Sequence, residues 1–233
     1  MTARRRFYKT VTVTDDNAIA LDGKPIKTPM KAPLRLPNRA LADAVAAEWE
    51  AQATEINPAA MPLTRLANTA IDRVSRERTK IEAEAVAYAN SDLVCYRADR
   101  PPDLVARQAA AWDPVVDWAR TALDAPFAVT SGVIHQPQPA AALTAFAAAE
   151  AALDDFELAA FHTVMTLTGS ALIAMMLARR AIPPEEAWRI AHVDEDYQVE
   201  LWGEDDEAKA RHAARREEFL ASCRFLRLAG AAN

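Results

Sequence analysis

The chain has 233 residues, of which 51% are hydrophobic and 26% are charged, the profile of a globular protein. Its formal net charge of −6 argues against a nucleic-acid binder, which would normally carry a concentrated basic surface. The two cysteines, Cys95 and Cys223, are far apart in the sequence and fit a reducing compartment better than a disulfide framework.

The first 37 residues have the pattern of short β-strands. Phe7, Val11 and Val13 alternate with Tyr8 and threonines, which predicts a half-buried strand, and Ile19 with Leu21 predicts a second one. The pair Asp22-Gly23 is a strong hairpin signal, because glycine tolerates the positive φ of a tight turn. Prolines then punctuate the chain, so we expect edge strands and loops, with a short last strand around Leu34 and Leu36.

Helical signals begin at Asn38, which can cap a helix with Leu41, Val45 and Trp49 on one face. An amphipathic stripe between Leu63 and Val74 predicts a second helix. Thr79 and Glu82 form a capping box that would open a third. We therefore expect a domain boundary near residues 75–80, with an N-terminal domain of residues 1–78 and a C-terminal domain of residues 79–233.

Almost all of the C-terminal part has a helical pattern. One helix should start at Pro101-Pro102 and be kinked or restarted at Pro114. Residues 126–137 should be extended or form a loop, and Asp154 with Glu157 forms another capping box. The next 21 residues, Leu158 to Ala178, carry no charged side chain and could span a bilayer by length. Their histidine, threonines and serine favour a helix buried inside the protein instead, and we expect no membrane insertion.

A further helix should start at Pro183-Pro184 and continue to Trp202, where Gly203 would end it. Asp205 or Asp206 would then cap a last, charge-rich helix that ends near Leu228.

The residues that would support catalysis or cofactor binding do not form a recognisable pattern. The five glycines are too far apart for a loop that cradles phosphate, so we expect neither ATP hydrolysis nor dinucleotide binding by the usual folds. None of the four histidines has another histidine or a cysteine at metal-binding spacing. We predict no catalytic residues, no metal, no cofactor and no small-molecule substrate.

The strongest anomaly is the acidic segment, residues 194–207, which holds eight carboxylates and no lysine or arginine, with Tyr197 and Trp202 among them. Three interpretations are open from the residues alone. The segment could be a solvated face with Trp188 and Trp202 in the core. It could be a cation site, although the calcium-loop pattern is missing. It could also be a partner surface, where aromatics supply buried area and carboxylates meet a basic patch.

An ordered set of motifs along the whole chain resembles the chaperones that assemble the F-type ATP synthase by binding its α subunit. The motifs are Arg6-Phe7-Tyr8-Lys9, Leu21 to Pro29, Ala47 to Gln52, Met61 to Asp72, Ser91 to Arg97, Gln108 to Pro114, Thr166 to Ser170, His192 to Gln198 and Trp202-Gly203. The resemblance implies an α+β fold, with a small N-terminal α/β layer of antiparallel strands plus helix and a larger all-helical C-terminal domain.

The resemblance also implies a function. Such chaperones hold the unassembled α subunit, cover the surface that later faces the β subunit, and leave when β takes their place. On this basis we nominate Glu195, Tyr197, Glu200, Trp202 and Asp205 as client-binding residues. A strand predicted within six residues of Met1 favours a bacterial cytoplasm, or the mitochondrial matrix after removal of a presequence.

Two other classes of function are the alternatives. One is a small hydrolase-like enzyme that uses the acidic segment as acid and base, which needs two facing carboxylates with perturbed pKa values. The other is a constitutive structural subunit of a larger assembly.

Overall fold

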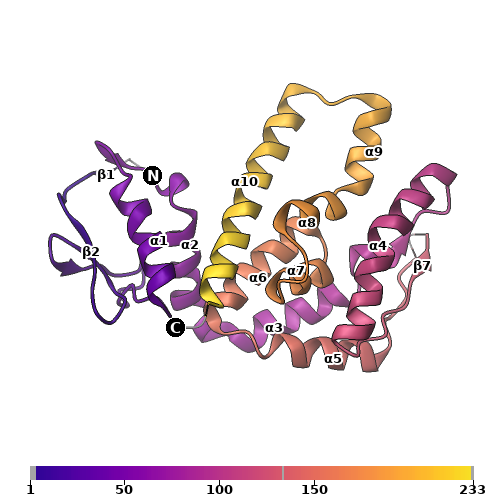
Figure 1. Ribbon diagram of the computed structural model, residues 1–233, viewed down its shortest axis with the longest axis horizontal. Helices are drawn as coiled ribbons and strands as arrows, with labels where there is room; N and C mark the ends of the chain where they lie inside the picture. The colour runs from indigo at the N-terminus through magenta and orange to yellow at the C-terminus, as the bar shows by residue number, and fades with distance from the viewer. Residues whose placement is uncertain (1–3, 133, 232–233) are drawn as a thin grey trace. The chain divides into compact units, whose positions relative to one another are not determined.

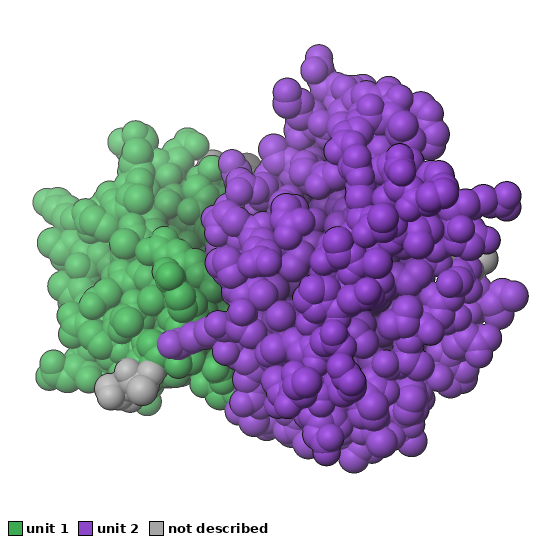
Figure 2. All heavy atoms as spheres, turned by 45° about the vertical axis from the view of Figure 1, so that its right-hand side comes forward, with its two compact units in different colours: residues 1–78, 154–160, 221–233 green, residues 79–153, 161–220 purple. Residues whose placement is uncertain are grey.

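Helices dominate the computed structural model, which describes residues 4–132 and 134–231 (Figure 1). The chain forms two compact units, coloured separately in Figure 2. Unit 1 contains Met1–Arg78, Asp154–Ala160 and Ala221–Asn233, and unit 2 contains Thr79–Leu153 and Phe161–Leu220. The expected division into residues 1–78 and 79–233 treats each domain as one continuous segment, and it remains a prediction.

Unit 1 contains short antiparallel strands, as expected for the α+β class. Strand β2 (Val11–Val13) pairs with β3 (Ile19–Leu21), which pairs with β4 (Lys24–Pro25), while β1 (Arg4–Arg5) pairs with β5 (Glu55–Ile56). The hairpin at Asp22-Gly23 is confirmed, because both residues have positive φ, 49° and 75°. The Asp22 carboxylate also accepts the backbone N–H groups of Lys9 and Thr10, which fixes the turn against the preceding chain.

Two details of the expected sheet are wrong. Residues 6–10 are not in a strand, and Phe7 is 58% exposed while Tyr8 is buried. The reason is that Tyr8 packs edge-on against Trp49 and donates its hydroxyl hydrogen to the Trp49 carbonyl oxygen at 2.6 Å. The expected strand at Leu34 and Leu36 is only an isolated bridge between Ala18 and Arg35, although both leucines are buried.

Helix α1 (Arg39–Glu50) starts at Asn38, whose side chain accepts the N–H of Leu41 at 2.9 Å, so this cap is confirmed. A 3-10 turn, η1 (Pro58–Ala60), leads into α2 (Pro62–Thr69). Residue Met61 supplies no side-chain cap for α2, and the carboxylate of Glu48 takes that role by accepting the N–H groups of Leu63 and Thr64 at 2.7 and 2.8 Å. Helix α1 therefore holds the start of α2 through a side chain.

The chain runs from α2 through a π-turn, η2 (Ala70–Val74), into α3 (Ser75–Ala89) without a new start at Thr79. The helix start expected at Thr79 is displaced by two residues, because the break in α3 falls at Glu77, and the capping box of Thr79 and Glu82 remains a prediction. The irregular residue is Glu77, with φ −115° and ψ 20°, which kinks the helix shortly before the boundary between the units.

Unit 2 is nearly all helical. Helix α4 (Pro102–Ala122) contains Pro114 and is followed by the expected loop, then by α5 (Ala140–Glu150). The 3-10 turn η3 (Leu93–Cys95) leads directly into strand β6 (Tyr96–Arg97). Strand β7 (Thr130–Ser131), which lies in the loop after α4, pairs with β6 in parallel. The α+β class is confirmed, with this two-residue pair as an addition to the helical part.

The uncharged stretch is two helices rather than the expected one. Helix α6 (Asp155–Thr168) begins at the capping box of Asp154 and Glu157, in which Asp154 accepts the N–H of Glu157 and the Glu157 carboxylate accepts the N–H of Asp154. Helix α7 (Ala171–Ala178) follows after Gly169, which has a φ of 68°. Residues 171–177 are all buried, so burial in the protein accounts for their apolar character. Within the described ranges, no helix is long and apolar enough to cross a membrane.

Candidate functional site

The candidate site lies where α8 (Pro184–Ala191), α9 (Val193–Trp202) and α10 (Asp206–Ala229) follow one another. The single helix expected from Pro184 to Trp202 is wrong, because the chain breaks at His192, with φ −111° and ψ 20°. The buried His192 ring stacks on Trp188, with centroids 3.7 Å apart, and its Nδ1 lies 2.8 Å from the Trp188 carbonyl oxygen. Trp188 and Trp202 therefore belong to different helices.

The two tryptophans on either side of this break differ in burial. Trp188 is buried, as expected of a core residue, but Trp202 is 78% exposed and does not belong to the core. Val199 and Leu201 are also exposed, at 40% and 55%. Three of the eight large apolar side chains exposed in the described part of the chain are therefore in the last turn of α9, and the solvated-face interpretation with a buried Trp202 fails.

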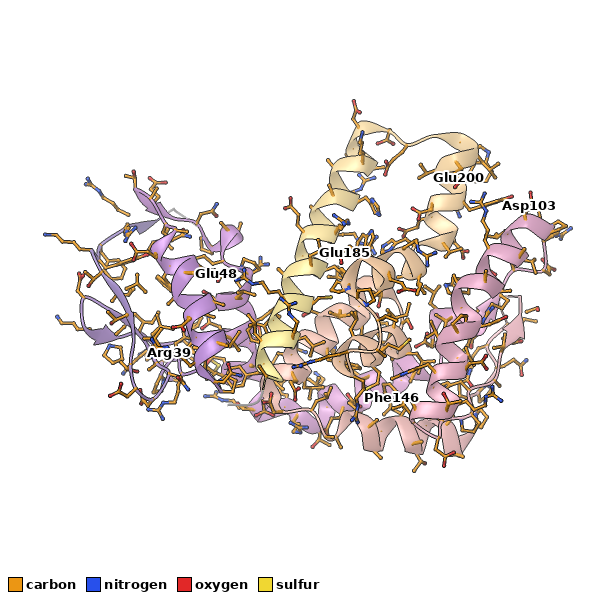
Figure 3. The ribbon with its side chains drawn as sticks, in the orientation of Figure 1. Arg39, Glu48, Asp103, Phe146, Glu185 and Glu200 are labelled. Atoms are coloured by element: carbon orange, nitrogen blue, oxygen red, sulfur yellow. The ribbon has the colours of Figure 1, made fainter. Side chains whose placement is uncertain are left out.

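Helix α4 braces the outer part of α9. A guanidinium nitrogen of Arg107 lies 2.7 Å from a carboxylate oxygen of Glu200, and the guanidinium carbon lies 5.2 Å from the centre of the Tyr197 ring. Figure 3 labels Glu200 on α9 beside the end of α4 that carries Asp103. The next residue of α4, Gln108, donates a side-chain N–H to the carboxylate of Asp194 at 2.7 Å. These contacts hold α9 in place while its apolar end stays exposed.

The remaining nominated residues have structural partners of their own. Glu195 lies between an imidazole and a guanidinium, with one carboxylate oxygen 3.5 Å from His192 Nε2 and the other 3.6 Å from Arg215. Asp205 accepts the N–H of Ala208 at 2.7 Å and caps α10, as expected. Gly203 ends α9 with a positive φ of 78°. The contacts above give the other four nominated side chains a structural role. They give none to Trp202, which is the most apolar of the five and is largely exposed.

A surface hollow of about 520 Å³ separates α9 from α10, and its walls have opposite charge. Glu195, Asp196, Glu204 and Asp205 line it from α9 and the connecting turn. Arg211, His212 and Arg215 line it from α10. Sequence reasoning missed these three residues and Arg107, although the i, i+4 spacing of Arg211 and Arg215 already placed two cations on one face of the last helix.

The histidines are closer than their sequence positions suggested. His192 and His212 belong to different helices, and their ring centroids are 5.3 Å apart, with Trp188 against both. Burial lowers the pKa of His192 below its ordinary value, so the ring is neutral at neutral pH.

Two carboxyls with a raised pKa, those of Asp92 and Glu48, act as helix caps. Burial raises the pKa of Asp92 to about 6. Asp92 accepts the N–H groups of Val94 and Leu172 at 3.2 and 2.9 Å, which ties η3 to the start of α7. Burial also raises the pKa of Glu48, the cap of α2 in unit 1. Each of these carboxyls is already bonded to backbone N–H groups, so each has a structural role that differs from the acid–base role that the hydrolase alternative needs.

Comparison with known proteins gives consistent matches. Residues 5–120 match the family model described as ATP12 chaperone protein. The crystal structure of Atp12 from Paracoccus denitrificans is 42% identical with a TM-score of 0.91, and the match covers 97% of this chain and 98% of that one. A candidate chaperone from Agrobacterium tumefaciens is 45% identical with a TM-score of 0.92, covering 97% and 86%. The mitochondrial protein atp12 of Schizosaccharomyces pombe is 22% identical over 220 residues, covering 88% of this chain and 75% of the relative.

Proposed function

Because the chain belongs to the ATP12 chaperone family, we propose that it binds the unassembled α subunit of the F-type ATP synthase. In this proposal it covers the surface of α that later contacts β, and β displaces it during assembly of the catalytic head. The family itself consists of ATP synthase assembly chaperones, and the choice of α and of its β-facing surface is the proposed part.

The observation that carries the proposal is the exposed end of α9. Trp202, Leu201 and Val199 offer apolar area at the rim of a hollow whose walls carry both signs of charge. Aromatic side chains supply much of the binding free energy at protein interfaces, and charged rims set orientation and association rate. An α subunit without β exposes a contact surface that favours aggregation, and this end of α9 can cover part of such a surface.

A chaperone that must be displaced needs moderate affinity. Obligate interfaces are large and mostly apolar, whereas transient ones are smaller and more polar. The α9 end has three exposed apolar side chains among carboxylates, which suits a contact that β can replace. We propose that the protein acts by this occlusion, without catalysis of its own, in the compartment where α is assembled: the bacterial cytoplasm or the mitochondrial matrix.

The test is capture of purified, unassembled α by the wild-type chain and by Trp202→Ala. Ile134→Ala is the matched control, because Ile134 is 75% exposed in the loop of unit 2. We expect Trp202→Ala to weaken capture at least about tenfold, a hot-spot effect, with an unchanged melting temperature. The control should capture α normally, and added β should release α from the wild-type chain.

Several outcomes would contradict the proposal. Equal capture by Trp202→Ala and wild type would remove α9 from the interface. A chain that stays in the finished enzyme would be a structural subunit, and turnover of a small molecule that stops on substitution within the acidic segment would support the hydrolase alternative.

A further inference from the structure

Two helices bring three side chains with metal-binding atoms together beside the hollow. They are His192 at the break before α9, Glu195 in the first turn of α9 and His212 on α10. Their ligand atoms all lie within 4.8 Å of one another. No local sequence pattern indicates this cluster, because His212 follows His192 by twenty residues and lies in α10, whereas His192 precedes α9.

The His192 ring is oriented as a metal-binding imidazole usually is. Nδ1 lies 2.8 Å from the Trp188 carbonyl oxygen and so carries the hydrogen, which leaves the lone pair on Nε2. That Nε2 lies 3.5 Å from a carboxylate oxygen of Glu195. A carbonyl that fixes the tautomer from behind is the typical second-shell partner of a histidine ligand. Stacking on Trp188 prevents the ring from turning.

His212 and Glu195 each have an atom near His192 Nε2 that could also bind a metal ion. Nε2 of His212 is buried and has no hydrogen-bond partner within the described residues. A buried polar atom without a partner is costly, and a bound cation would satisfy it. Arg215 contacts only one oxygen of Glu195, at 3.6 Å, so the oxygen that faces His192 remains available.

We propose that His192 Nε2, His212 Nε2 and one Glu195 carboxylate oxygen bind a zinc ion that joins the start of α9 to α10. Two imidazoles and one carboxylate suit zinc better than calcium or magnesium, which take oxygen ligands. Ligand atoms about 2.0–2.1 Å from a tetrahedral zinc are roughly 3.3 Å apart. The 3.5 Å between His192 and Glu195 already matches this spacing. A shift of the His212 side chain would complete the set, and a water molecule from the hollow would fill the fourth position.

Arg215 sets the expected strength of the site. Its positive charge beside Glu195 repels a cation, so the affinity should be lower than that of a structural zinc finger. The site does not depend on the proposed function, and its test uses metal binding alone.

The experiment measures zinc binding to the tag-free, full-length chain by competition with a coloured chelator, and records cobalt absorption as a probe of tetrahedral geometry. The variants are His212→Ala and Glu195→Gln, and His135→Ala is the control, because His135 contacts Tyr96 elsewhere in unit 2. We expect one zinc per wild-type or His135→Ala chain. Each of the other variants should bind at least about tenfold more weakly.

Thermal melting provides a second readout, since a ligand that binds only the folded chain raises its melting temperature. Zinc should raise the melting temperature of wild type and His135→Ala but not that of His212→Ala. Failure of wild type to bind zinc, binding by His212→Ala with wild-type affinity, or equal loss in the control would each overturn the proposal. His212 is only partly buried, so its alanine variant is expected to fold.

Discussion

Arg107 on α4 and Glu200 on α9 form an ion pair across the two helices, with 2.7 Å between guanidinium nitrogen and carboxylate oxygen. Both side chains are about half exposed, at 45% and 57%, so the pair contributes only about 0.2–1 kcal/mol to the free energy of unfolding. The same carboxylate is proposed to face the α subunit, so the two roles of Glu200 need to be separated.

Exchanging the two charges separates them. The single variants Arg107→Glu and Glu200→Arg should both lose capture of α, while the double variant restores the ion pair. If Glu200 faces the client, we expect capture by the double variant to remain low while its melting temperature returns close to wild type. Measured capture that recovers fully in the double variant would show that Glu200 acts only by holding α9 against α4.

Asn38 should tolerate aspartate poorly, although the two residues are usually equivalent as helix caps. Its side-chain oxygen caps α1, and its amide nitrogen donates to the carbonyl oxygens of Leu228 and Ala229 at 2.8 and 3.1 Å, at the end of α10. Aspartate keeps the first bond but turns the second donor into an oxygen facing carbonyl oxygens. We expect Asn38→Asp to lower the free energy of unfolding, measured by urea denaturation, by about 1–3 kcal/mol.

The control for this prediction is Asp205→Asn, the opposite exchange at the exposed cap of α10. Its effect should stay within about 1 kcal/mol, because only the interaction with the helix dipole changes. Similar losses at both positions would mean that the amide of Asn38 does not stabilise the end of α10.

Asp92 should make stability fall as the pH rises. Its pKa in the folded chain is about 6, above the 3.8 of an ordinary aspartate, so the folded state holds the proton more tightly. Its contribution is therefore fully present below pH 3.8, declines between 3.8 and 6, and is constant above. A shift of about two units corresponds to roughly 3 kcal/mol.

The measurement is the free energy of unfolding of wild type and Asp92→Asn from pH 3.5 to 7. Wild type minus variant should decrease by roughly 3 kcal/mol across this range, because all other carboxyls are common to both chains. A difference that does not change with pH would contradict a raised pKa at Asp92.

Glycine should be required at position 169 because the backbone there has a positive φ, not because a larger side chain would collide with its neighbours. Its φ is 68°, and a Cβ added there would meet Leu93 atoms at 3.8 Å, which is an ordinary contact. We expect Gly169→Ala to lower the free energy of unfolding by about 1–2 kcal/mol. Gly169→Val should lose more, because β-branched residues disfavour this region further. An alanine variant as stable as wild type would show that the turn between α6 and α7 can change its conformation.

The features that the sequence predicted correctly are local. The Asn38 cap, the Asp22-Gly23 hairpin, the Asp154 and Glu157 capping box and the Asp205 cap each join residues no more than five apart. The residue types at that spacing determine such contacts, whatever the rest of the fold does. The features that it missed depend on distant partners. Tyr8 is buried because it contacts Trp49, and α7 starts anew where Asp92 accepts the N–H of Leu172, eighty residues later.

The candidate site divides in the same way. Composition alone identified the acidic segment, because eight carboxylates without a neighbouring cation stand out in any sequence. Helical periodicity could not tell which of its aromatics are exposed, since it assumes one continuous helix and the helix breaks at His192. The exposure of Trp202, the brace from Arg107 and the approach of His212 to His192 all follow from that break and from packing between helices.

By itself, then, the sequence determined several helix starts, such as those capped by Asn38, Asp154 and Asp205, together with the α+β class and the unusual charge of residues 194–207, because these depend on near neighbours or on composition. Only the tertiary structure decided which face of each helix is buried and which distant side chains meet. A helix break at a single residue, such as His192, changes which side chains of the following helix face the core. Hydrogen bonds such as that from Trp112 Nε1 to the Ile190 carbonyl oxygen, at 2.8 Å, join positions that no local pattern connects.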